Sequence, residues 1–203
     1  MADLVIPGWQ EPVEAAVEAL PLRFFGDQGL RRVATPIAEV TSDIVELAHR
    51  MLVTMEEEDG VGLAAPQVGH SIRMFTHALS DEAPPVLINP EFLEGRGEWV
   101  YREGCLSVPG LYYDLVRAEE VFFRAYGLDG EPFTIEATGL LGRVLLHELD
   151  HLDGILMVDR LTGDARKNTE AELKSRVNGT LGSGDPFLTG RAIPKLKTSR
   201  MVL

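Results

Sequence analysis

Two histidines four residues apart, His147 and His151, carry the clearest chemical signal in the chain, and Glu148 follows the first of them. In an α-helix, residues i and i+4 share one face, so both imidazoles can bind a single metal ion. Glu148 is rotated by about 100° from His147 around the helix axis, so its carboxylate can reach a water at the metal without being a ligand. The alternative is a chance pair of histidines on an exposed helix.

Two histidines leave a catalytic metal site one ligand short, because such sites usually have three protein ligands and an open position. No His follows His151, and Asp153 and Asp159 are the nearest downstream carboxylates, the first of them too close along the same helix for the usual arrangement. Upstream, Cys105 is the only cysteine in the chain. A lone cysteine is otherwise a small buried apolar residue, so the third ligand stays open at this point.

Two helices are expected from apolar residues at three- and four-residue spacing. One runs over 141–152 through the histidine motif and stops at Gly154. The other runs over 44–57, with Asp43 as its N-cap in a capping box, and ends before Gly60. The polar stretch 164–178 could form a further helix.

Short runs of β-forming residues, broken by Gly, Pro and Asn, fill the chain between the two helices. A hairpin turn is expected at 129–130, where Asp is followed by Gly. Because no helix separates these runs, we expect mainly antiparallel sheets and an α+β fold. The expected strands are 72–76, 86–88, 99–101, 116–126 and 133–137.

The composition is that of one globular domain: 203 residues, of which 45% are hydrophobic and 25% charged. The net charge of −13 disfavours contact with phosphate backbones, so DNA is not an expected partner. No apolar run approaches the ~18 residues of a membrane helix, and no Lys or Arg precedes Arg23, as a targeting segment would require. With a single cysteine, the composition favours a cytoplasmic protein.

Three segments, Gly60–Gln67, Glu103–Ser107 and His147–His151, occur in this order, and together they resemble the three signature motifs of the peptide deformylases without a substitution. The similarity extends over about 22–162. It implies a central metal-binding helix with small, mainly antiparallel β-sheets packed around it. It also implies that Cys105, His147 and His151 bind one divalent metal ion. In this family that ion is usually Fe²⁺ in the cell, and Ni²⁺, Co²⁺ or Zn²⁺ can replace it in purified protein.

The resemblance further implies a reaction, the hydrolytic removal of the N-formyl group from the N-terminal methionine of newly made polypeptides. Glu148 would accept a proton from the attacking water and later give it to the departing amine. The side-chain amide of Gln67 and the backbone N–H of Leu106 would stabilise the oxyanion that forms. Glu103 and Arg117 match positions that usually form a structural ion pair in the family.

Substrate contacts are expected from four residues near these motifs. By the same resemblance, Gly62 would pair with the extended substrate as an added strand, and Val61, Leu140 and Val144 would form the methionine pocket, although core packing is the alternative for these three. Gly60 and Gly62 flank Val61, where we expect close backbone approach and a positive φ.

The resemblance leaves both ends of the chain outside it. We expect an N-terminal extension over 1–21, a catalytic domain over 22–178 and a basic, flexible tail over 179–203. The tail has four basic residues against one Asp, so it either contacts the ribosome or is simply solvated. Leu146 stands where many relatives have Gln, which puts one supporting hydrogen bond beside His147 in doubt.

Two other functions fit part of the pattern. A metallopeptidase with the same helix motif would need a ligand after His151 and would have no special need for Cys105. A binding module that holds a metal or formyl-peptides without turnover would tolerate the loss of Glu148.

Overall fold

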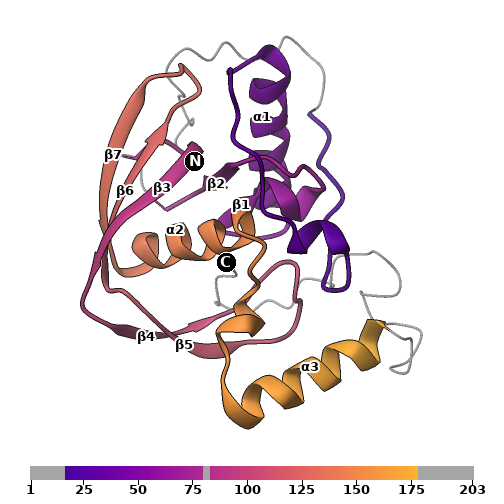
Figure 1. The fold of residues 1–203 in the computed structure, drawn as a ribbon. Helices are drawn as coiled ribbons and strands as arrows, with labels where there is room; N and C mark the ends of the chain where they lie inside the picture. Colours follow the sequence, from indigo (N-terminus) through magenta and orange to yellow (C-terminus); the bar gives the residue numbers. More distant parts are fainter. Residues whose placement is uncertain (1–16, 80–82, 178–203) are drawn as a thin grey trace.

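The helix that carries the histidine motif, α2 (Gly139–Leu152), is the central element of the computed structural model, which describes residues 17–79 and 83–177 (Figure 1). It begins two residues before the expected helix and ends at the expected residue. Gly154 follows with φ +72°, so the predicted stop is confirmed. The C-terminal half of α2 is buried almost throughout, which places the motif inside the protein.

Two antiparallel sheets lie against α2, and the predicted α+β class is confirmed. The five-stranded sheet has the order β1-β2-β3-β6-β7, and the small sheet pairs β4 with β5. The strands are β1 (Gly62–Ala64), β2 (Met74–His77), β3 (Val86–Arg96), β4 (Trp99–Glu103), β5 (Tyr113–Arg117), β6 (Glu120–Tyr126) and β7 (Pro132–Thr138).

The strands β1 and β2 and the first residues of β3 are buried on both faces of the large sheet. Because side chains alternate along a strand, Leu63, Met74 and Ile88 pack on the side of α1 (Ser42–Glu57). Their neighbours Ala64, Phe75 and Leu87 pack on the other side, in the cluster that contains Leu145 of α2. β1, β2 and β3 therefore separate α1 from α2. This arrangement explains why their sequences are apolar without alternation.

The small sheet is tied to α2 by hydrogen bonds rather than by a second apolar face. The guanidinium of Arg143 on α2 donates to the carbonyls of Trp99 on β4 and Leu115 on β5. Arg117 on β5 donates back to the carbonyl of Leu146 on α2 (3.4 Å). The metal-motif helix is therefore held between the two sheets.

The chain after α2 forms a short 3-10 helix, η3 (Met157–Arg160), and then α3 (Gly163–Val177), close to the helix expected over 164–178. Only Thr169 and Leu173 of α3 are buried. Thr169 Oγ1 donates to the hydroxyl of Tyr113 (2.7 Å), so α3 contacts the start of β5. Two more 3-10 helices are η1 (Gln28–Arg31) and η2 (Ala65–Val68). Within the described ranges no helix combines the length and the apolarity that crossing a bilayer requires.

Three expectations about element bounds were wrong. The expected strand 116–126 is two strands in different sheets, because the chain passes from β5 to β6 at 118–119 without any Gly or Pro to mark the change. β3 continues past the Asn89-Pro90 pair, since bulges there absorb the irregular residues and Asn89 (φ 49°) bonds its side chain to both backbone groups of Ile37. Thr41, not Asp43, is the N-cap of α1, and Asp43 lies in the first turn.

The segment before residue 22 contacts the domain at its described end. The side chain of Leu20 is buried in the cluster around α1, and its backbone N–H donates to Thr54 Oγ1 (2.8 Å). Most of the expected extension, residues 1–16, lies outside the described residues, and so does the expected tail over 179–203.

The turn after α2 yields a stability prediction. A Cβ added at Gly154 would lie 2.7 Å from the carbonyl oxygen of Arg31, at a positive φ, whereas Gly130 has a similar φ of +79° and open space around it. We expect Gly154→Ala to lower the free energy of unfolding by about 3 kcal/mol and Gly130→Ala by about 1 kcal/mol. Urea unfolding of both variants measures the difference. Equal losses would contradict the assigned close contact.

Candidate active site

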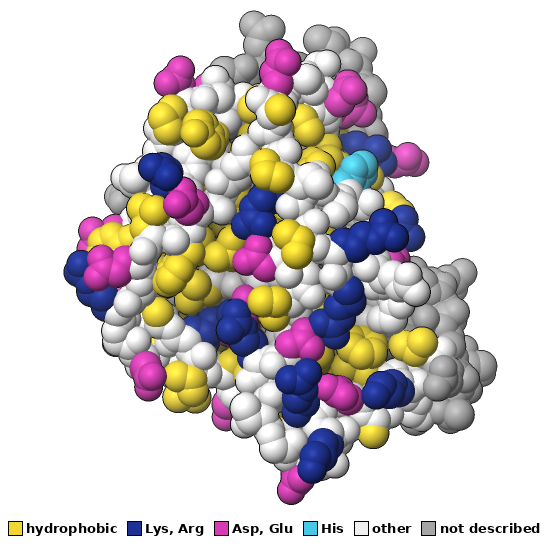
Figure 2. Space-filling view, viewed as in Figure 1, with side chains coloured by type: hydrophobic (Ala, Val, Ile, Leu, Met, Phe, Trp, Pro, Cys, Tyr) yellow, Lys and Arg dark blue, Asp and Glu magenta, His cyan; other side chains and the backbone are white. Residues whose placement is uncertain are grey.

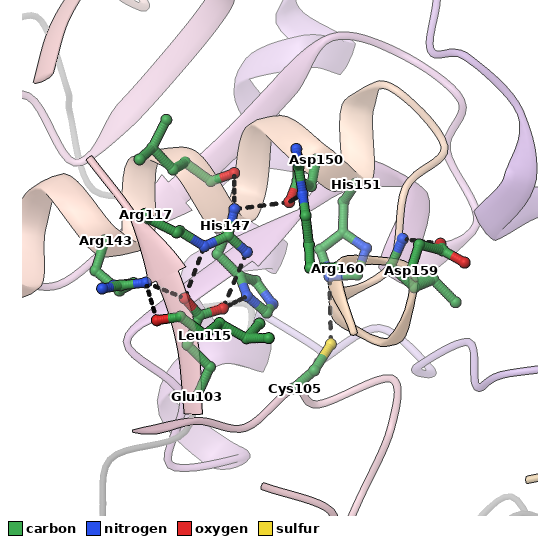
Figure 3. Close-up of polar contacts among 12 residues, drawn as sticks. Glu103, Cys105, Leu115, Arg117, Arg143, His147, Asp150, His151, Asp159 and Arg160 are labelled. Carbon is green, nitrogen blue, oxygen red and sulfur yellow. Dashed lines mark hydrogen bonds and ion pairs between the residues drawn. The ribbon is translucent and has the colours of Figure 1, made fainter. Parts of the chain in front are cut away.

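Cys105, His147 and His151 converge on one point, although Cys105 comes from the loop between β4 and β5 and the histidines come from α2 (Figure 3). One ligand atom from each lies within 4.8 Å of the others. Cys105 Sγ is 3.3 Å from His151 Nε2. All three side chains are no more than 1% exposed. Among the described residues this is the one cluster of three such side chains that could hold a metal ion.

His147 is oriented by a buried carboxylate. Its Nδ1 lies 3.0 Å from Glu103 Oε2, and because the ionised carboxylate only accepts, Nδ1 carries the proton. The other ring nitrogen, Nε2, is then a free acceptor; it is buried without a hydrogen-bond partner in the described part of the chain. The orientation of His147 thus comes from Glu103.

Glu103 is fully buried and its carboxylate accepts from three side chains (Figure 3). Arg117 donates to both oxygens (2.7 and 3.0 Å), and Arg143 donates to Oε1 (2.9 Å). Burial alone would raise the pKa of Glu103, but the hydrogen bonds from His147 and Arg117 hold that pKa well below its ordinary range. The expected ion pair between Glu103 and Arg117 is therefore present.

The three converging side chains fit a divalent transition metal. Burial lowers the pKa of His151 well below its ordinary value, so its imidazole is neutral and able to bind a metal. Burial raises the pKa of the Cys105 thiol, so a cation must displace the thiol proton when it binds. One thiolate and two imidazoles suit Fe²⁺, Co²⁺, Ni²⁺ or Zn²⁺ rather than Mg²⁺ or Ca²⁺. The unpartnered His147 Nε2 supports the same conclusion.

Glu148 lies against β1, on the side of α2 next to the metal ligands. A Cβ added at Gly62 would lie 2.4 Å from Glu148 Oε1 and 2.8 Å from Val144 Cγ1, so only glycine fits between strand and helix. Glu148 is fully buried, and burial raises its pKa well above the ordinary value. A carboxyl group in such a place holds a proton more firmly than an exposed one and can exchange it with a neighbouring water.

Positive φ is found at neither Gly60 nor Gly62, contrary to expectation; the residue with positive φ at this turn is Asp59 (55°). Close approach is the reason for both glycines. A Cβ at Gly60 would lie 2.9 Å from Leu106 Cδ1. Glycine is required at these two positions because Leu106 and Glu148 leave no room for a Cβ, not because of the backbone angles.

The side chain of Gln67 reaches the cysteine loop from η2. Its Oε1 accepts from the backbone N–H of Ala64 (2.7 Å), which leaves the amide group directed at Ser107 Oγ (3.3 Å) and Cys105 Sγ (3.8 Å). Gln67 is fully buried. Leu106 follows Cys105, so its backbone lies beside the metal ligands, and its side chain packs in the cluster around α1.

Val61, Val144 and Leu140, the expected pocket residues, do lie together. Val61 and Val144 form a small buried cluster, and the partly buried Leu140 and Leu79 pack against it. Leu79 was not singled out from the sequence. Its position follows from the antiparallel pairing of β1 with β2, where Ala78 N–H donates to the Val61 carbonyl (3.1 Å).

Three charged residues near the site were missed or left without a role. Arg143 stands in an apolar run, four residues before His147, and that placement was an available signal. Asp150 accepts from Arg117 (2.7 Å) and from Arg160, which lies on η3. The contacts of Arg160 depend on the path of the chain after α2, which the sequence pattern does not specify.

The downstream carboxylates that a metallopeptidase would need are engaged elsewhere. Asp153 pairs with Arg73 (2.7 Å), and Asp159 accepts from Arg31 and from the backbone N–H of Leu156 (2.8 Å). Neither belongs to the metal-ligand cluster found in the described residues. The side chain that completes a possible metal-binding cluster with the two histidines is therefore the upstream Cys105.

Comparison with known proteins agrees with this site. The polypeptide deformylase family model matches residues 19–167. A peptide deformylase of Alkalilimnicola ehrlichii is 45% identical over 177 residues, which cover 85% of this chain and 98% of that protein. The crystal structure of a peptide deformylase from Legionella pneumophila has a TM-score of 0.73 and 36% identity, covering 80% of this chain and 97% of that one.

A further solved structure is a peptide deformylase from Acinetobacter baumannii with Met-Ala-Ser bound, with a TM-score of 0.68 and 36% identity over 72% of this chain and all of that one. The family match, the identities over most of the chain and the Cys-His-His site agree with one another. The chain belongs to the peptide deformylase family, metal-dependent hydrolases that remove the N-formyl group from newly made polypeptides and release formate.

Proposed function

We propose that residues 22–178 form the catalytic domain and that Cys105, His147 and His151 bind its metal ion, with Glu148, Gln67 and Leu106 as catalytic residues. The observation that carries this assignment is the convergence of the three ligand side chains beside a buried glutamate. When bound, the metal acts as a Lewis acid that activates water and polarises the formyl carbonyl.

Glu148 is the proton carrier in this proposal. Its buried carboxylate accepts a proton from the attacking water and then protonates the amine that leaves the formyl carbon. The raised pKa supports both steps, because a carboxylate with a raised pKa is a stronger base toward the attacking water and holds the proton until the amine leaves.

Gln67 and Leu106 stabilise the oxyanion. The Gln67 amide is held by Ala64 and directed toward Cys105 and Ser107, so its N–H groups are oriented before substrate arrives. The Leu106 backbone N–H is the other donor. Donors fixed in advance need no reorganisation as charge develops, which is why such groups lower a barrier efficiently.

The substrate backbone binds along β1. This strand lies at the edge of the five-stranded sheet, so one side of it has no strand partner in the described chain. An extended peptide can add to such an edge, with Gly62 supplying backbone hydrogen bonds. The methionine side chain then occupies a pocket of Val61, Leu140 and Val144, which pack together beside β1. The tripeptide Met-Ala-Ser bound to the Acinetobacter baumannii relative supports a peptide ligand of this kind.

Glu148→Gln tests the proton carrier. The amide keeps the shape of the side chain but cannot accept the proton, so we expect formate release from a formyl-Met tripeptide to fall roughly 10³-fold. Metal content, measured by elemental analysis, should stay at the wild-type value. Glu46→Gln, an exposed position on α1, is the matched control and should leave activity unchanged. Activity retained by Glu148→Gln would favour another base.

The metal in the cell is Fe²⁺ in this proposal, and the thiolate and two imidazoles are compatible with it. Protein purified without oxygen should contain about one iron per chain, as one three-ligand cluster implies. On exposure to air, formate release by this form should decline, because Fe²⁺ is oxidised. Protein reconstituted with Ni²⁺, which air does not oxidise, should keep its activity. Zinc in place of iron after anaerobic purification would contradict the assignment.

We place the protein in the cytoplasm and propose the basic tail, 179–203, as a ribosome contact, with 1–21 as an extension outside the catalytic domain. Figure 2 shows that Lys and Arg side chains on the viewed face are interspersed with Asp and Glu. The described chain contains ion pairs such as Arg73–Asp153 and Arg166–Glu170. The tail sequence therefore carries an excess of positive charge that this face lacks. Ribosomal RNA is a polyanion that lies close to a newly made polypeptide, so it is the proposed partner of the tail.

Deletion of 179–203 tests the tail. We expect co-sedimentation with ribosomes at low salt to weaken at least about tenfold, because phosphate contacts dominate such affinity. A full-length control replaces Arg191, Lys195, Lys197 and Arg200 with Gln and should lose binding to the same extent. Formate release from the tripeptide should not change in either variant. Undiminished co-sedimentation would show that the tail is only solvated.

A further inference from the structure

Arg143 is a fully buried arginine that the proposed chemistry does not use. It stands four residues before His147 on α2, so both side chains point to the same side of the helix, where they meet Glu103 (Figure 3). Burying a guanidinium is costly unless its charge is compensated and its N–H groups are paired. Its contacts therefore indicate what it contributes.

Those contacts join α2 to the strand that leads to the cysteine. Arg143 Nη2 donates to the carbonyl of Trp99 at the start of β4, and Nη1 donates to Glu103 Oε1 (2.9 Å) at its end. Nη1 also donates to the carbonyl of Leu115 on β5 (3.2 Å). One side chain thus fixes both ends of β4 relative to α2. Cys105 follows two residues after the end of that strand.

Arg117 alone does not supply all the hydrogen bonds that the carboxylate of Glu103 accepts. Its guanidinium is shared, since Nη1 donates to Asp150 (2.7 Å) while Nε and Nη2 bind Glu103. Oε1 of Glu103 accepts from Arg117 and Arg143, and Oε2 accepts from Arg117 and His147. Each oxygen therefore has two donors, and Arg143 is the second donor to Oε1, the oxygen that does not face His147.

We propose that Arg143 is a positioning residue of the metal centre, which acts through Glu103 on the orientation of His147 and through β4 on the placement of Cys105. This inference rests on the proposed metal ligation. Partners that orient a metal-bound histidine typically change metal affinity when they are removed. A residue that only stabilised the fold would change the free energy of unfolding and leave the affinity of the folded protein unaltered.

The test compares Arg143→Met with Leu145→Ala. Leu145 is equally buried on the same helix, but it packs in the apolar cluster with Phe75 and Leu87 of the large sheet. We therefore expect its truncation to lower stability without changing the contacts of the metal centre. Zinc affinity is measured on each folded full-length protein by competition with a chelator. We expect Arg143→Met to weaken zinc binding by about 10- to 100-fold and Leu145→Ala to leave it unchanged.

A second measurement, by NMR, follows the hydrogen bond between His147 and Glu103 directly. In the zinc-loaded wild type, the Nδ1–H proton of His147 should give a ring N–H resonance that exchanges slowly with water, because it is donated to buried Glu103. Arg143→Met should speed this exchange or abolish the resonance, and Leu145→Ala should not. Wild-type zinc affinity together with an unchanged resonance in Arg143→Met would overturn the proposal.

Arg143→Lys keeps the test decisive if the methionine variant does not fold. Its ammonium can replace Nη1 at Glu103 but cannot reach the Trp99 carbonyl as well, so we expect an intermediate loss of zinc affinity, roughly three- to tenfold. Wild-type affinity and resonance in this variant would count against positioning. Failure of the ligation itself is seen separately, because His147→Ala would then bind zinc as the wild type does.

Discussion

The buried carboxylate of Glu103 is the contact on which the rest of the site depends. It lies at the end of β4, accepts from β5 through Arg117 and from α2 through Arg143 and His147, and so joins the small sheet to the helix. Without it, Arg143 would be buried without its ion-pair partner and Arg117 would keep only Asp150, at a cost of several kcal/mol. The same contact fixes the tautomer of His147. Stability and metal binding therefore share one interaction.

The site combines this ion-paired carboxylate with a second buried carboxylate, Glu148, which forms no ion pair within the described residues. Glu148 lies where β1 approaches α2 closely enough to exclude any side chain at Gly62. Arg117 lowers the pKa of Glu148, but burial outweighs it, whereas for Glu103 direct hydrogen bonds outweigh burial. Two glutamates in one small volume thus have opposite pKa shifts. One stays ionised as a support and the other can exchange a proton.

The sequence was informative where local rules decide the structure. The period of the apolar residues around His147 predicted α2 to within two residues, and Gly154 marked its end. The division of 116–126 between two sheets could not be predicted, because the choice of sheet depends on partners such as β3 and β4 that lie elsewhere in the chain. The position of Arg143 in an apolar run was a signal, but its contacts with Trp99 and Leu115 could not be predicted, because no spacing rule brings those carbonyls to it.

The glycine motif shows that one of two expected physical reasons can hold without the other. Gly60 and Gly62 were expected to permit both close backbone approach and a positive φ, yet the positive φ belongs to Asp59. What the glycines provide is the absence of a Cβ facing Leu106 and Glu148. Leu106 and Glu148 belong to the other two motifs, so each of the three segments limits the space of another. Their joint occurrence in the sequence therefore reflects mutual packing around the metal centre as much as separate chemical roles.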